Sequence, residues 1–181
     1  MKICIFCGAN SSLDKDVVLK AKEVMKTFYE KNVELVYGGA AIGVMGALAD
    51  DLLDKGGRVT GIIPQHLMKK EVAHADLSDL IVTKDMHERK QTMYSLSDAF
   101  LIFPGGMGTL DELFEIVTWR QLGLHHKPIA IFNINGYFDS LLKFLDHAVA
   151  QGLIKQSDRE IIFSSPDWKS VHSHFVSSWN G

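Results

Sequence analysis

The sequence has no long apolar run and no large excess of charge of one sign, and both absences exclude classes of protein. No stretch of its 181 residues approaches the ~20 apolar residues that a membrane helix needs, and the apolar run after Lys2 is too short for a secretory signal. Its 19 lysines and arginines nearly balance 22 aspartates and glutamates, so no overall field draws it to nucleic acid or an anionic membrane. We therefore expect a cytoplasmic protein without nucleic-acid or membrane partners, and any phosphate ligand must be held locally.

Cysteine is scarce, and the sequence shows no metal-binding pattern. Cys4 and Cys7 form a C-x-x-C pair, a spacing that is found in redox and metal sites. Both lie inside an apolar run, and residues three apart in a strand point to opposite faces. We therefore expect two buried strand cysteines that do not meet. The eight histidines show no ligand-type spacing with carboxylates, so no metal or other cofactor is predicted.

Hydrophobic residues make up 46% of the chain, and they occur in runs that alternate between strand and helix patterns. This alternation is typical of βαβ units. Runs such as 99–103 are continuously apolar, which favours parallel strands that helices cover on both faces. We predict a single α/β domain, 1–181, with a doubly wound, mostly parallel sheet. The expected strands are 3–7, 33–37, 58–63, 80–82, 99–103 and 129–132, and the expected helices are 15–31, 44–55, 86–95, 110–122, 137–151 and 167–178.

The first glycine cluster, residues 38–46, follows the second predicted strand. Glycines at such a turn permit positive φ and close approach of backbone amides to a ligand, which makes Gly39 and the neighbouring Met45 candidate binding residues. Gly46 would let the next helix pack closely on the sheet. The segment does not match G-x-G-x-x-G, which disfavours a dinucleotide-dependent oxidoreductase. A purely structural tight turn is the alternative.

The second cluster, residues 104–112, reads P-G-G-M-G-T-L-D-E and follows the fifth predicted strand. The glycines leave a bare loop of N–H donors, and the helix expected to begin near Thr109 aims its positive end at the same place. This pattern predicts an anion cradle formed by Gly105, Gly106, Gly108 and Thr109. The alternative is a T-x-x-E capping box, in which Glu112 turns back to the Thr109 amide.

The third cluster, residues 85–90, reads D-M-H-E-R-K at the same sheet edge. Arg89 and Lys90 project about 100° apart on a helix, so we expect at least one of them to grip an anionic group. The alternative is a solvated charge run at a helix start.

Together, these three clusters resemble the LOG (Lonely Guy) family, whose members have often been labelled lysine decarboxylase-like. The resemblance extends from residues 5–8 to the region of Gly136 and Tyr137. It implies a Rossmann-like fold, a dimer or higher homo-oligomer, and hydrolysis of an N6-substituted adenosine monophosphate to free base and ribose 5-phosphate. Ala40 stands where family members often have a third glycine. The resemblance implies catalytic roles for Arg89 and Glu112. It also implies nucleotide contacts from Glu71, Lys90, Gly106, Met107, Gly108, Thr109, Leu110, Asp111, Glu112 and Thr118.

These residues suggest a division of labour in N-glycosidic cleavage. The reaction builds positive charge on the sugar, so a carboxylate beside the ribose stabilises it and can activate water. We assign that role to Glu112, phosphate binding to the turn 105–109, and nucleotide positioning to Arg89, with Lys90 reinforcing the phosphate site or the structure. Decarboxylation is disfavoured because no lysine has a pyridoxal context. A non-enzymatic nucleotide-binding or cofactor-carrier module remains the alternative.

Overall fold

The computed structural model describes residues 1–8, 15–68 and 73–179, and it contains a seven-stranded sheet in the order β4-β3-β2-β1-β5-β6-β7. Every pairing between its strands is parallel. The strands are β1 (Lys2–Phe6), β2 (Glu34–Tyr37), β3 (Val59–Pro64), β4 (Asp79–Thr83), β5 (Ala99–Ile102), β6 (Ile129–Phe132) and β7 (Ile162–Ser165). The helices are α1 (Lys15–Glu30), α2 (Gly43–Asp54), α3 (Met86–Leu96), α4 (Met107–Gln121), α5 (Asp139–Ala150), α6 (Gln156–Arg159) and α7 (Trp168–Trp179), with short 3-10 turns η1 (Gln65–Leu67) and η2 (Ile134–Gly136).

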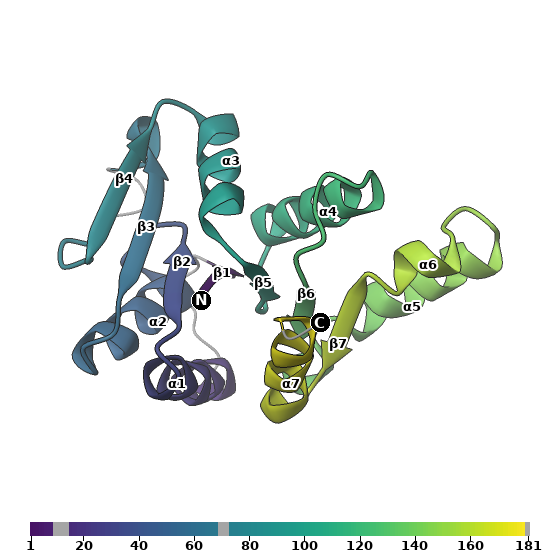
Figure 1. The fold of residues 1–181 in the computed structure, drawn as a ribbon, viewed down its shortest axis with the longest axis horizontal. Coiled ribbons are helices and arrows are strands. Elements are labelled where there is room, and N and C mark those ends of the chain that lie inside the picture. Colours follow the sequence, from purple (N-terminus) through teal and green to yellow (C-terminus); the bar gives the residue numbers. More distant parts are fainter. Residues whose placement is uncertain (9–14, 69–72, 180–181) are drawn as a thin grey trace.

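Helices cover both faces of the sheet, as predicted from its apolar strands (Figure 1). One buried cluster joins the sheet to α1, α2 and α7, and the other joins it to α3, α4 and α5. All four residues of β5 are buried because both clusters contact this strand. Cys4 belongs to one cluster and Cys7 to the other, which confirms that these two buried thiols face apart.

The strand order reverses beside β1, because β2 lies on one side of it and β5 on the other. In parallel sheets, ligands bind beyond the carboxyl ends of the strands at such a switch point. Cys7 and the beginnings of the two glycine clusters lie in the turns after β1, β2 and β5, and Arg89 lies near the start of α3, the helix that follows β4.

The sequence pattern did not reveal β7 or α6. The strand Ile162–Ser165 has two apolar residues followed by two serines, too weak a pattern to separate it from a loop. It joins the sheet as an edge strand through its pairing with β6. Within the described ranges, no helix has both the length and the apolar character needed to span a membrane.

Candidate active site

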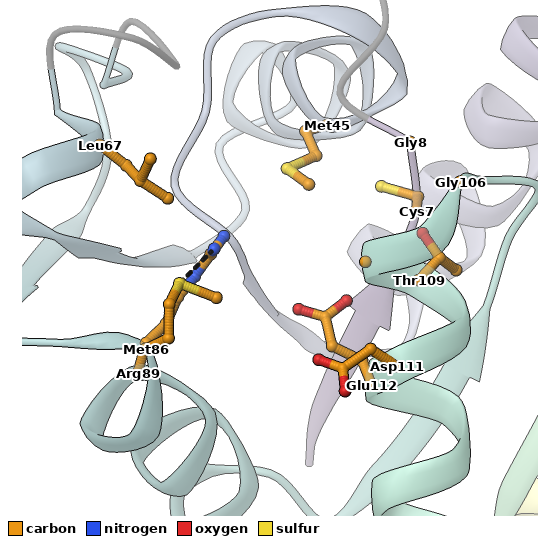
Figure 2. Close-up of a pocket in the computed structure, with 11 residues that line it drawn as sticks. Cys7, Gly8, Met45, Leu67, Met86, Arg89, Gly106, Thr109, Asp111 and Glu112 are labelled. Atoms are coloured by element: carbon orange, nitrogen blue, oxygen red, sulfur yellow. Dashed lines mark hydrogen bonds between the residues drawn. The ribbon is translucent and has the colours of Figure 1, made fainter.

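A cavity of about 410 Å³ opens at the switch point, within the ~300–1,000 Å³ typical of small-molecule sites. It lies between α3 and α4, and side chains from both helices meet there (Figure 2). The described residues that line it are Cys7, Gly8, Met45, Leu67, Met86, Arg89, Gly106, Gly108, Thr109, Asp111 and Glu112. The three clusters predicted from the sequence therefore come together in one cavity.

Arg89 enters this cavity from α3 as a buried side chain. Its Nε donates to the Ile62 carbonyl and its Nη2 to the Gly38 carbonyl, both at 3.0 Å. Only 4% of Arg89 is exposed, so the interpretation of residues 85–90 as a solvated charge run is wrong for this residue. Two carbonyls from neighbouring strand ends thus fix the direction of the guanidinium.

The acidic residues of this segment form the helix cap. Asp85 is the N-cap of α3, and its carboxylate accepts from the Glu88 amide at 2.9 Å. The Glu88 carboxylate in turn accepts from the Lys84 amide at 2.8 Å. Amides at a helix start lack partners within the helix, so these bonds stabilise its first turn. The cap holds the start of the helix that presents Arg89.

Gly38 makes room for this guanidinium. A Cβ atom at residue 38 would come closer than 3.0 Å to Arg89 Nη2, a separation that real Cβ atoms essentially never show. The φ of Gly38 is not among the positive values, so an alanine would fit the backbone and clash with the arginine. Glycine is therefore required here because the Arg89 guanidinium approaches the backbone too closely for a side chain to fit.

The α4 helix begins at Met107, with Gly106 as its N-cap, and no side chain caps it. The alternative interpretation as a capping box is wrong, as is the expected helix start near Thr109, because Thr109 lies inside the helix and Glu112 lies more than one turn beyond its start. A Cβ on Gly106 or Gly108 would meet nothing within 4 Å, so the space over the first turn is open. Both glycines line the cavity, where the helix dipole favours an anion.

Glu112 lies on α4 and is 8% exposed. Figure 2 shows the carboxylates of Asp111 and Glu112 on the α4 side of the cavity and Arg89 on the α3 side. Burial, with the charge of Glu112 as the next cause, raises the pKa of the Cys7 thiol well above its usual range. Cys7 is therefore a neutral thiol in the wall of the cavity at physiological pH.

Lys90 does not line this cavity. Its ammonium pairs with Asp111 at 3.1 Å and with Glu115 at 2.9 Å, both on α4, and its side chain is 14% exposed. Burial lowers the pKa of Lys90, but the bonds to the two carboxylates outweigh it and raise the pKa overall. Lys90 thus ties α3 to α4 one residue away from Arg89.

Several predicted binding residues lie elsewhere in the structure. Gly39 takes a φ of +80° in the turn after β2, and the atoms nearest to a Cβ on Gly46 would belong to Ala41 of that turn. Thr118 lies in a separate cavity of about 230 Å³ between α4 and α5. Glu71 falls outside the described residues. Gly105, Met107 and Leu110 belong to the loop and first turn of α4 without lining the cavity.

The sequence reasoning missed four lining residues, Cys7, Gly8, Leu67 and Met86. Cys7 and Gly8 follow β1, so the rule that ligands bind beyond strand ends could have found them. Met86 lies three residues before Arg89 on the same helix face, which is also a readable signal. Leu67 comes from the 3-10 turn after β3, where the sequence shows no pattern. In the described part of the chain, no group of three His, Cys, Asp or Glu side chains is placed to hold a metal ion.

Similarity to known proteins identifies the family of the chain. The family model described as "possible lysine decarboxylase" matches residues 45–175. The cytokinin riboside 5'-monophosphate phosphoribohydrolase LOG3 of Arabidopsis thaliana is 42% identical over 170 residues, covering 94% of this chain and 79% of that protein. The chain belongs to the LOG family. A probable phosphoribohydrolase of the same kind from Oryza sativa subsp. japonica, LOGL1, is 43% identical over 165 residues, covering 91% of this LOG-family chain and 74% of the rice protein.

Solved structures with the same fold are more distant in sequence. The Moco carrier protein of Chlamydomonas reinhardtii superposes with a TM-score of 0.73 at 16% identity, covering 99% of this LOG-family chain and 97% of that one. The molybdenum cofactor binding protein of Rippkaea orientalis gives a TM-score of 0.68 at 19% identity, with 97% and 95% covered. This likeness shows the Rossmann-like fold and nothing about function. The decarboxylase label has no support from the described cavity lining, which offers no lysine for a pyridoxal Schiff base.

Proposed function

We propose that the protein hydrolyses the N-glycosidic bond of an N6-modified adenosine 5'-monophosphate and releases the free base and ribose 5-phosphate. One observation carries this proposal: Arg89 and Glu112 lie on two sides of the same cavity, which is also lined by the start of α4, where no side chain caps the helix. The names of relatives with 42% and 43% identity support the same reaction.

In this proposal, the residues on the two sides of the cavity bind different parts of the nucleotide. The 5'-phosphate binds at the first turn of α4, where the open space over Gly106 and Gly108 admits it to the backbone amides. The sugar of a nucleotide bound in this way lies further along α4, toward Glu112, in our proposal. Arg89, held by its two carbonyl partners, orients the nucleotide and stabilises charge on the departing base. Thr109 adds its hydroxyl at the phosphate.

Cleavage then follows the logic of glycoside hydrolysis. The bond from C1' to the base nitrogen breaks with its electron pair going to the base, and positive charge develops on the ribose. The Glu112 carboxylate stabilises that charge and accepts a proton from the water that attacks C1'. The departing base takes up one proton from solvent and Glu112 releases the proton it accepted to solvent, so the products are neutral base and ribose 5-phosphate and the carboxylate is regenerated.

We further propose that the protein recognises AMP-type nucleotides, that it is cytoplasmic, and that it forms a homodimer or a higher homo-oligomer. Large apolar side chains are exposed after α4, on α5 and after α5. Leu122 after α4 is 67% exposed, Phe144 on α5 is 62% exposed, and Leu153 after α5 is 82% exposed. Exposed apolar side chains of this size favour association with a second copy of the chain. Sedimentation of the purified protein distinguishes a dimer from a monomer.

The direct test is Glu112→Gln, which keeps the shape of the side chain and removes its charge. We expect kcat to fall by about 10²- to 10⁴-fold, the usual contribution of a general base, while the nucleotide still binds. Release of free base from AMP and from its N6-prenylated form is followed by chromatography, with Glu30→Gln on the exposed end of α1 as the control. Base release by Glu112→Gln at the wild-type rate would exclude this residue. Nucleotide binding by the wild type without any product would instead favour a carrier.

A further inference from the structure

A rigid turn follows β6 on the side of the sheet edge where the cavity opens. The Asn133 side chain donates to the Asp139 carboxylate at 2.7 Å and accepts from the Phe138 amide at 2.8 Å. Gly136 has a φ of +70°, and a Cβ there would come within 2.7 Å of Asp139. The Tyr137 amide donates to the Ile134 carbonyl at 3.0 Å. These bonds fix the backbone that carries Tyr137.

The Tyr137 hydroxyl reaches from this turn to the glycine loop before α4. It donates to the Gly105 carbonyl at 2.8 Å, across 32 residues of sequence. The preceding carbonyl, that of Pro104, accepts from the Gly8 amide at 3.1 Å. Two successive carbonyls of the loop are therefore held by donors from two other segments of the chain.

Holding these carbonyls also sets the direction of the loop amides. The described chain has no cis peptide bond, and in a trans peptide the C=O and N–H point in opposite directions. The bond from Tyr137 to the Gly105 carbonyl therefore directs the Gly106 N–H away from Tyr137. Gly106 lines the cavity, so its amide belongs to the donors that an anion would meet there. Peptides between glycines rotate easily, so the hydrogen bond from Tyr137 restricts an orientation that the loop would not fix by itself.

We propose that Tyr137 is a positioning residue for the anion-binding loop and thereby strengthens the preference for ligands that carry a phosphate. This inference rests on the phosphate site of the proposed function and adds a residue outside the cavity to it. Tyr137 is 56% exposed and its ring contacts Phe138 edge-on, so little apolar surface depends on it. Its bond to Gly105 is the interaction by which it reaches the loop.

The variant Tyr137→Phe removes this hydroxyl and keeps the ring. Dissociation constants are measured by calorimetry for AMP, ribose 5-phosphate and adenosine. We expect AMP and ribose 5-phosphate to bind about two- to tenfold more weakly, the range that one hydrogen bond gives, and adenosine to bind as before. In turnover, KM for the nucleotide rises by a similar factor and kcat changes less. Tyr29→Phe, an equally exposed tyrosine on α1, is the control and leaves all three affinities unchanged.

Three outcomes would overturn the proposal. The first is a Tyr137→Phe variant that binds both phosphate compounds as the wild type does. The second is an equal loss of affinity for adenosine, which would indicate a general structural effect. The third is a wild type that binds AMP no better than adenosine. Because these outcomes concern binding, a wild type that prefers AMP but does not hydrolyse it would refute the proposed reaction and still decide the role of Tyr137.

Discussion

Replacing Gly38 by alanine is expected to disable Arg89 by steric crowding, although residue 38 itself does not line the cavity. The new Cβ would come within 3.0 Å of Arg89 Nη2, whereas ordinary contact begins at 3.4 Å, so the guanidinium must retreat by at least 0.4 Å. That nitrogen now donates to the carbonyl of Gly38 itself at 3.0 Å. The backbone has no positive φ at this position, so the new methyl group acts on its neighbours, chiefly the arginine and, at 3.1 Å from its sulfur, the flexible side chain of Met45.

The size of the effect follows from the bonds that hold the guanidinium. A hydrogen bond to a charged group contributes about 1.5–3 kcal/mol, and displacement weakens the bond to Gly38 and strains the bond to Ile62. A misplacement of about 1 Å in an active site can lower the rate by ~10²-fold. We therefore expect kcat/KM to fall by about 10²-fold, or ~2.7 kcal/mol in transition-state stabilisation. The melting temperature should change little compared with this loss.

A double-mutant cycle with Arg89→Ala tests whether the effect passes through the arginine. The kcat/KM of nucleotide hydrolysis is measured for the wild type, the two single variants and the double variant. If Gly38→Ala acts only by displacing Arg89, the double variant is no slower than Arg89→Ala alone. Additive losses would refute this reasoning, and so would a Gly38→Ala enzyme with wild-type kcat/KM.

Two further predictions concern the helix tie and the buried thiols. Lys90→Met removes the links to Asp111 and Glu115 and should cost about 1 kcal/mol in stability and about tenfold in kcat, with the Kd of AMP nearly unchanged. Lys20→Met on α1 is the control, because this lysine pairs only within its own helix. A large loss of AMP affinity would mean that Lys90 grips the phosphate instead. Burial raises the pKa of the Cys4 and Cys7 thiols above the 9.0 of a free thiol, so the unfolded chain loses these protons first as pH rises. The free energy of unfolding should therefore fall above pH 9 by up to ~1.4 kcal/mol per pH unit per thiol. Urea titrations at pH 8 and 10 measure this fall, and Cys7→Ala should remove the part of it that the Cys7 thiol contributes. A fall of the same size in Cys7→Ala would contradict the raised pKa of this thiol.

The sequence predicted the sheet well because local pattern and tertiary role agree in its central strands. The run 99–103 is apolar throughout, and the structure buries every residue of β5 between two helix layers. The carboxyl ends of such strands then locate the site, since parallel strands bring their following turns to one edge. The regions of both Arg89 and Glu112 could therefore be identified from the sequence alone.

The same reasoning could not find contacts between distant segments. Gly38 is followed by Gly39, and nothing in a single sequence shows that the first makes room for a side chain 51 residues away while the second adopts a positive φ. Arg89 and Lys90 raised a similar difficulty. Helix geometry shows that these two side chains point in different directions. It does not show which of them reaches α4, because that depends on the positions of the Asp111 and Glu115 carboxylates, with which Lys90 forms ion pairs.

The error at the start of α4 shows why the position of a helix end matters for chemistry. With Thr109 as the cap, Glu112 would fall three residues later and bend back to a free amide. With Gly106 as the cap, Glu112 is buried in the second turn, four residues beyond Gly108. At 1.5 Å per residue this places it roughly 6 Å further along the helix axis, comparable with the span from a 5'-phosphate across the ribose. One short segment thus supplies the proposed anion site and an acid at a fixed separation, provided that a glycine and not the threonine begins the helix.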